Sequence, residues 1–338
     1  MRGTLVVGAF SPSVLLRTGR RLGLVDPGVR EVPVASSPAQ FAALLDGDIG
    51  AALTSPDNVI AYRFVPANPL GRTADVRIVS AVDRGLGLAL YARPGLSTAA
   101  ELAEALSGSA AGSPTGPSGG SPAGSAVGSA GGSAGGSAGG SAGGSVVSDA
   151  VGVDVPGSGF AFALYAALEA IGLRPGDYRT VALGSTPRRL EALLGGRCAA
   201  TMLNAGADLR AQDAGAVRLA GVPRPYLGTV LCSLGPDPAV RDLAAALRAT
   251  ARAIVGGEAD DVVTEEAAAA LRLPPATAAR YLQRLKDPGE GLVADGRADA
   301  ASLSTVLGLR RRYGDAPGGD LLDQGLLDSP DSGEDRGR

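Results

Sequence analysis

The fold of this chain is decided by residues 151–238, which read VGVDVPGSGFAFALYAALEAIGLRPGDYRTVALGSTPRRLEALLGGRCAATMLNAGADLRAQDAGAVRLAGVPRPYLGTVLCSLGPDP. Short runs of strand type end here at turns of small residues, and two turns, Gly157-Ser158-Gly159 and residues 184–187, lead directly into helical patterns. A third run of strand type ends at the side-chain amide of Asn204. Strand ends that meet helix N-termini form clefts for small polar ligands in α/β proteins, so the stretch predicts ligand binding.

The N-terminal part of the chain alternates between strand and helix patterns in the same way. Strands are expected at residues 4–10, 29–34 and 49–53, and helices at residues 14–22, 41–45 and 59–63. This alternation predicts a parallel sheet with crossover helices. Two capping boxes, from Ser37 to Gln40 and from Thr98 to Glu101, mark further helix starts.

The pattern beyond Pro238 is helical. Helices are expected at residues 240–254, 264–271, 276–285 and 300–313. Asp237 is placed to cap the first of them, and Thr264 with the two glutamates that follow it is placed to begin the second. These helices are expected to fold back onto the first half of the chain.

We therefore expect an α/β protein of two lobes, each a mainly parallel sheet flanked by helices. Residues 1–85 and 228–314 would form the first lobe, and residues 86–227 the second lobe with the hinge crossings. Residues 107–148, rich in Gly, Ser and Ala, are expected to be a disordered insertion in the second lobe, with a true interdomain linker as the alternative. Residues 315–338 are expected to be an acidic flexible tail.

The composition excludes several kinds of chemistry. The chain has no His, which removes Ser-His-Asp triads, Cys-His pairs and histidine metal sites. Its only Lys is Lys286, and Cys198 and Cys232 lack metal-binding spacing, so both cysteines are interpreted as small buried hydrophobic residues. We therefore expect no metal and no cofactor.

Partners and location follow from charge and hydropathy. The net charge is −3 and no basic patch with interleaved aromatic residues occurs, so nucleic-acid binding is not expected. No run of about 20 apolar residues is present, so no transmembrane segment is expected. The apolar run after Met1 is too short for a signal peptide, which predicts a cytoplasmic protein, or an extracytoplasmic one if the true start lies upstream.

Three stretches are informative together: GDIGAA at residues 47–52, VDVPGSGF at residues 153–160 and LEALLGGRCAAT at residues 190–201. They resemble the type 2 periplasmic-binding-protein fold, in the branch that includes taurine, sulfonate, nitrate and thiamine-precursor binding proteins of ABC importers. One phrase occurs once in each expected lobe, as LLDGDIGA from Leu44 and as LLGGRCAA from Leu193. The resemblance covers residues 1–106 and 149–313.

The resemblance implies a solute-binding component of an ABC-type import system that closes on its ligand by hinge motion. The implied ligand is a small organic solute, anionic or zwitterionic and containing nitrogen or sulfur. The implied partners are this small-molecule ligand and an ABC permease, and the protein itself is expected to be a monomer. The thiamine-precursor synthases of the branch use a His and a Lys, which this chain does not supply at matching positions.

Two other functions stay open at this point. One is a cytoplasmic enzyme on the same fold, a dehydratase or lyase of the menaquinone-pathway type, in which Asp57, Asp83 or Ser158 would transfer protons. The other is a ligand-sensing accessory protein without a DNA-binding module. The lack of His and of any acid pair placed by a motif favours binding over catalysis.

The candidate ligand-binding residues lie at the turns that end the expected strands or near the expected hinge. They are Ser11, Ser13, Ser55, Asp57, Asn58, Asp83, Ser158, Gly159, Phe160, Asn204 and Tyr226. The N–H groups at Ser158, Gly159 and Phe160 open a helix and are expected to face an anionic group, although Ser158 could serve as a cap alone. Arg188 and Arg189 are expected on the outer face of their helix, and no residue is assigned a catalytic role.

Overall fold

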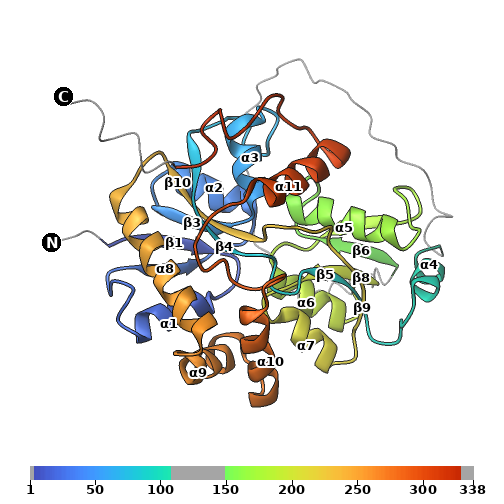
Figure 1. Ribbon diagram of the computed structural model, residues 1–338. Coiled ribbons are helices and arrows are strands. Elements are labelled where there is room, and N and C mark those ends of the chain that lie inside the picture. Colours follow the sequence, from blue (N-terminus) through green and yellow to red (C-terminus); the bar gives the residue numbers. More distant parts are fainter. Residues whose placement is uncertain (1–3, 108–148, 329–338) are drawn as a thin grey trace, which may run out of the picture.

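The computed structural model describes residues 4–107 and 149–328, which form two five-stranded sheets (Figure 1). The first sheet has the strand order β2-β1-β3-β10-β4. Its strands are β1 at Val6–Ala9, β2 at Arg30–Pro33, β3 at Ala51–Thr54, β4 at Val76–Asp83 and β10 at Thr229–Leu234. Strand β1 is parallel to β2 and β3, whereas β10 is antiparallel to its neighbours β3 and β4.

The second sheet repeats this plan, with the order β7-β6-β8-β5-β9. Its strands are β5 at Ala89–Ala92, β6 at Ala150–Val153, β7 at Arg179–Ala182, β8 at Ala200–Leu203 and β9 at Val217–Gly221. Here β5 is the antiparallel strand, between β8 and β9. The expectation of two lobes, each with a mainly parallel sheet, is confirmed.

The chain passes between the sheets twice. The first crossing joins β4 to β5 and the second joins β9 to β10, so each sheet receives its antiparallel strand directly after a crossing. The first crossing needs unusual backbone, because Gly85, Leu86 and Gly87 all have positive φ. An added Cβ at Gly228, in the second crossing, would lie 2.4 Å from backbone atoms of Gly85, so the two crossings touch and only glycine fits there.

Helices cover both sheets. Those around the first sheet are α1 at Val14–Arg21, α2 at Ser37–Leu45, α3 at Pro56–Phe64, α8 at Pro238–Gly256 and α9 at Asp260–Leu271. Those around the second sheet are α4 at Ala99–Ser107, α5 at Gly159–Ala170, α6 at Thr186–Leu194 and α7 at Ala207–Asp213. Among the described residues, no helix is long and apolar enough to cross a membrane.

The last two helices span the junction between the lobes. Helix α10, at Pro275–Lys286, contacts α9 and α7, and helix α11, at Ala300–Tyr313, contacts α3 and α5. In Figure 1 they lie on opposite sides of the region where the sheets meet, α11 above it and α10 below it. The C-terminal helices were expected to pack on the first half of the chain, and they also contact α5 and α7 of the second lobe.

Three local expectations were also wrong. The N-cap of α2 is Ser36 rather than Ser37, and Gln40 forms no capping box, because its buried amide donates to the carbonyls of Gly8 and Leu53 at 3.0 and 3.1 Å. Helix α9 begins at Asp260, one turn before Thr264. The second capping box is confirmed, since Thr98 accepts from the Glu101 N–H and the Glu101 carboxylate accepts from the Thr98 N–H.

The segment after α11 differs from the flexible tail that was expected. Leu321 and Leu326 are buried, the Ile78 N–H donates to the Leu326 carbonyl at 2.9 Å, and Asp328 forms a bidentate ion pair with Arg241. The described part of the segment is therefore attached to β4 and α8. Of the Gly/Ser/Ala insertion expected at residues 107–148, all but Ser107 lies outside the described residues, as do residues 329–338.

Candidate functional site

Three strands are followed by serine residues that cap the next helix, and these serines line cavities at the junction of the lobes. Ser13 accepts from the Leu16 N–H at 3.2 Å, Ser55 from the Asn58 N–H at 3.3 Å and Ser158 from the Ala161 N–H at 3.1 Å. A serine at the N-cap satisfies an N–H group that the helix itself leaves unpaired. The same local chemistry therefore places polar side chains from both lobes at the edges that face each other.

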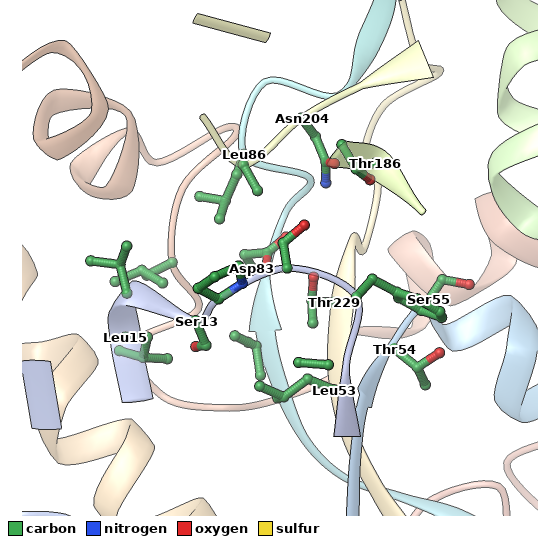
Figure 2. Close-up of a pocket in the computed structure, with 18 of the residues that line it drawn as sticks. Ser13, Leu15, Leu53, Thr54, Ser55, Asp83, Leu86, Thr186, Asn204 and Thr229 are labelled. Carbon is green, nitrogen blue, oxygen red and sulfur yellow. The ribbon is translucent and has the colours of Figure 1, made fainter. Parts of the chain in front are cut away.

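Between the lobes lies a cavity of about 100 Å³, which we call the cleft cavity (Figure 2). Its first-lobe lining includes Ser11, Ser13, Thr54, Ser55, Asp83 and Thr229. Its second-lobe lining includes Phe160, Thr186, Asn204 and Ala205. In Figure 2, Asn204 and Thr186 reach toward the cavity from one side, and Asp83, Thr229 and Ser13 lie on the other side.

Asp83 is the acidic residue of the cleft cavity and lies at the end of β4, where the first crossing begins. Its side chain is 3% exposed, and it accepts hydrogen bonds from the Gly85 N–H at 2.8 Å and from the hydroxyl and N–H of Thr229. Burial raises the pKa of Asp83 to about 6, because these hydrogen bonds only partly offset the lost hydration. Asp83 thus joins the crossing backbone to the cavity wall.

The second-lobe wall is formed by Asn204 and Thr186. Asn204 follows β8 and is 7% exposed, and its side-chain amide has no hydrogen-bond partner among the described residues. Thr186, at the start of α6, accepts a hydrogen bond at 3.0 Å from Arg189. Because Asn204 lines the cleft cavity, its amide can bind a ligand or water there.

Arg189 lies behind this wall, not on the outer helix face that the sequence predicted. It is 2% exposed and donates to the carbonyls of Met202 and Gly184 at 3.2 and 2.6 Å, as well as to Thr186. Leu190 and Leu193 correctly predicted the apolar face of α6. They did not indicate that an arginine can be buried on the same face when carbonyl groups accept its hydrogen bonds. The charge of Arg189 is therefore held inside the second lobe.

A second, smaller cavity adjoins the cleft cavity and shares Phe10, Ser55, Phe160 and Thr186 with it. It is lined by the predicted residues Asn58, Ser158 and Gly159 as well. Asn58 is held by a 2.9 Å hydrogen bond from its amide to Thr54, and the hydroxyl of Ser158 donates to Asp154. Both side chains therefore have internal partners in addition to their places at this cavity.

Asp57 lies at neither cavity, although it was predicted as a cleft residue. Its carboxylate accepts hydrogen bonds of 2.6 and 2.8 Å from Arg310 of α11 and another from the N–H of Gly159. Asp57 belongs to α3 of the first lobe, whereas Gly159 opens α5 of the second lobe. A carboxylate of the protein itself thus occupies the helix N-terminus at which a ligand anion was expected.

Tyr226 is 1% exposed in the second crossing and does not line the cleft cavity. Burial raises the pKa of its hydroxyl, and the nearby Asp57 and Asp83 act in the same direction. Tyr226 therefore packs within the second crossing between the sheets and not against the cleft cavity.

Several lining residues were missed by sequence reasoning. They are Phe10, Thr54, Thr186, Thr229 and Tyr281. Thr54 stands next to Ser55, which was chosen, and Thr186 lies in the turn at residues 184–187 that leads into a helix. Their places at a strand end and a helix start were therefore the available signal. Tyr281 is on α10, whose approach to the first crossing leaves no local pattern in the sequence.

The two cysteines lie in the interior of the protein. Cys198 and Cys232 are both buried and unpaired with each other, as expected, and burial raises the pKa of each thiol to about 12. Among the described residues, no group of three or more Cys, Asp or Glu side chains is arranged to hold a metal ion.

Comparison with solved structures identifies the fold. The alkanesulfonate-binding protein SsuA of Xanthomonas axonopodis pv. citri, bound to MOPS, is similar with a TM-score of 0.63 and 16% identity, over 97% of this chain and 95% of that chain. The chain has the periplasmic-binding-protein fold. SsuA of Escherichia coli, a periplasmic aliphatic sulphonate binding protein, gives a TM-score of 0.59 at 14% identity, over 97% of this chain and 89% of that chain.

Other similar structures of this fold include the periplasmic nitrate-binding protein NrtA of Synechocystis PCC 6803. It has a TM-score of 0.58 and 12% identity, over 82% of this chain and 69% of that chain. No protein-family model matches the sequence. No curated protein matches it either. The expected periplasmic-binding-protein fold is thus confirmed.

Proposed function

We propose that this protein is the substrate-binding component of an ABC-type import system and that it holds a small organic solute in the cleft cavity. The observation that carries this proposal is the shared lining of the cavity. Polar side chains from strand ends and helix starts of both lobes meet there, so a bound solute would contact both lobes at once. A site of this kind suits capture by closure, since neither lobe alone encloses the ligand.

The proposed solute is anionic or zwitterionic and contains nitrogen or sulfur. The hydroxyl and amide groups of Ser11, Thr186 and Asn204 support a polar ligand, and similar structures include proteins whose names give sulfonates and nitrate as ligands. The proposal includes an ABC permease as partner and a monomeric state. An importer component works outside the cytoplasmic membrane, so this location replaces the cytoplasmic one in our proposal.

Ligand-dependent stabilisation tests the proposal. Purified protein is heated with single sulfonates, amino acids, amines, pyrimidines and dicarboxylates, and hits are measured by calorimetry and small-angle scattering. A solute at 100 times its Kd stabilises the folded state by about 2.7 kcal/mol. We expect at least one hit that also reduces the radius of gyration and is recovered unchanged by NMR.

A blocking variant with a matched control localises the binding. Ser11→Phe fills the cleft cavity and is expected to abolish binding, whereas Ser304→Phe on the exposed side of α11 is expected to preserve it. The proposal fails if no solute stabilises the protein, if Ser11→Phe binds normally, or if the hit is converted to a product. Conversion would favour the enzyme on this fold.

A further inference from the structure

The cleft cavity has an uneven distribution of charge. Asp83 and Tyr281 are the titratable side chains among its lining residues, and no Arg or Lys lines it in the described part of the chain. Arg189 lines the smaller adjoining cavity but not the cleft cavity, and it already donates to the carbonyls of Met202 and Gly184 and to the Thr186 hydroxyl. The charge that a ligand meets on the cavity wall is therefore negative, and it is on the first lobe.

Asp83 is a buried carboxylate without a cationic partner. Within residues 4–107 and 149–328, no Arg or Lys nitrogen forms a salt bridge with it, and its donors are the neutral groups of Gly85 and Thr229. By contrast, the buried carboxylates of Asp57 and Asp208 are paired with Arg310 and Arg284. A buried charge without a counter-charge is costly, so a ligand cation at Asp83 would supply the missing partner.

The opposite wall offers hydrogen-bond donors. The amide of Asn204 has no partner among the described residues, so its NH₂ group is free to donate into the cavity. The Thr186 hydroxyl accepts from Arg189, which leaves its own hydrogen to donate. Both residues reach toward the cavity from the side opposite Asp83 (Figure 2). This wall therefore suits an acceptor oxygen on the far end of the same ligand.

We infer that the cleft cavity selects solutes with a protonated amine, which Asp83 binds, and with an oxygen acceptor that Asn204 and Thr186 bind. The inference rests on the proposed solute-binding function and narrows it. Among the proposed ligands it favours zwitterions, and it excludes anions that lack an amine. Asp83 is thereby assigned as the residue that determines specificity.

Matched pairs of probes test this inference by calorimetry at pH 7.5. The pairs are β-alanine with propionate, taurine with ethanesulfonate, and ethanolamine with ethanol, so that each pair differs by one amine. A charge-assisted hydrogen bond contributes about tenfold to a hundredfold in affinity. For any pair that binds, we expect the amine member to bind more tightly by about this factor.

Two variants assign the effect to its residue. Asp83→Asn keeps an acceptor for Gly85 and is expected to remove the preference within each pair, whereas Asn204→Ala is expected to weaken both members and keep the preference. Circular dichroism and thermal unfolding establish that both variants are folded. If Asp83→Asn does not fold, competition by methylammonium against a bound probe in the wild-type protein replaces it, and competition is expected.

The outcomes separate this inference from the proposed function. If amine-free members bind as tightly as their partners, or if Asp83→Asn retains the preference, the inference is overturned while solute binding stands. Absence of competition by methylammonium also overturns it. If none of the probes binds and the wider solute screen gives no hit, the proposed function and the inference fail together.

Discussion

The buried ion pair between Asp57 and Arg310 is expected to control both the stability and the closure of the protein. Its side chains are 1% and 5% exposed, and two hydrogen bonds of 2.6 and 2.8 Å join them. Asp57 also accepts from the N–H of Gly159, so one carboxylate joins α3, α11 and α5. We predict that Asp57→Ala strongly destabilises the protein and loosens the junction of the lobes.

The expected loss of stability follows from the contacts that the Arg310 guanidinium loses. In Asp57→Ala, its guanidinium keeps the Asp315 carbonyl at 2.8 Å and the Phe162 ring at 5.2 Å, but no carboxylate. Removing one partner of a buried ion pair costs about 3–5 kcal/mol, because the remaining charge stays buried without compensation. In a chain of this size, where 1 kcal/mol shifts Tm by about 2 °C, the expected fall in Tm is roughly 6–10 °C.

Urea unfolding and calorimetry measure this effect, and two further variants isolate its cause. Asp46→Ala removes an ion pair with Arg72 whose side chains are 62% and 59% exposed, so its expected cost is below about 1 kcal/mol. The double variant Asp57→Leu with Arg310→Met removes both charges and is expected to regain most of the lost stability. A cost for Asp57→Ala no greater than that for Asp46→Ala would refute the reasoning.

Two further predictions concern the cleft and the same junction. Below pH 6, affinity for any amine probe is expected to fall about tenfold per pH unit as Asp83, whose pKa burial raises to about 6, takes up a proton. The hydroxyls of Tyr226 and Tyr281 stay protonated over this range, because burial and Asp83 raise their pKa values. Calorimetry measures the affinity, and an affinity that is constant from pH 7 to pH 5 would contradict the predicted role of Asp83. Gly159→Ala would place a Cβ 2.4 Å from Asp57 Cβ and is expected to cost about 1–3 kcal/mol in urea unfolding. Gly308→Ala, with no atom within 4 Å of the new Cβ, is the control, and equal costs for the two would contradict this prediction.

The fold could be predicted from sequence because its signals are local. Each β-to-α turn combines an apolar run with a small polar cap, and Ser13, Ser55 and Ser158 all cap as such residues do in general. The order of strand and helix patterns then left few arrangements besides two mainly parallel sheets. The same turns predicted Ser11, Asp83 and Asn204 at the cleft cavity, since strand ends of a parallel sheet lie at one edge.

The rest depended on contacts between distant segments. Gln40 matches a capping box, but Gly8 and Leu53 offer buried carbonyls that compete for its amide. Arg189 is charged, and only the carbonyls of Met202 and Gly184 make its burial favourable. The segment after α11 is polar in composition, but it is attached to β4 because the Ile78 N–H donates a hydrogen bond to the Leu326 carbonyl. Sequence periodicity contains none of these partners, since each lies on another element.

The helix start at Ser158 and Gly159 shows a limit of predicting a ligand site from sequence alone. The positive end of a helix attracts an anion, and the sequence predicted one there. The anion in the structure is Asp57, which comes from the other lobe and also pairs with Arg310. With this helix N-terminus and Arg310 both engaged by the protein, the cleft cavity retains Asp83 as its acidic residue and Asn204 as an unpaired amide. The chemistry that distinguishes ligands is therefore expected in these two residues, because the more familiar anion site already stabilises contact between the lobes.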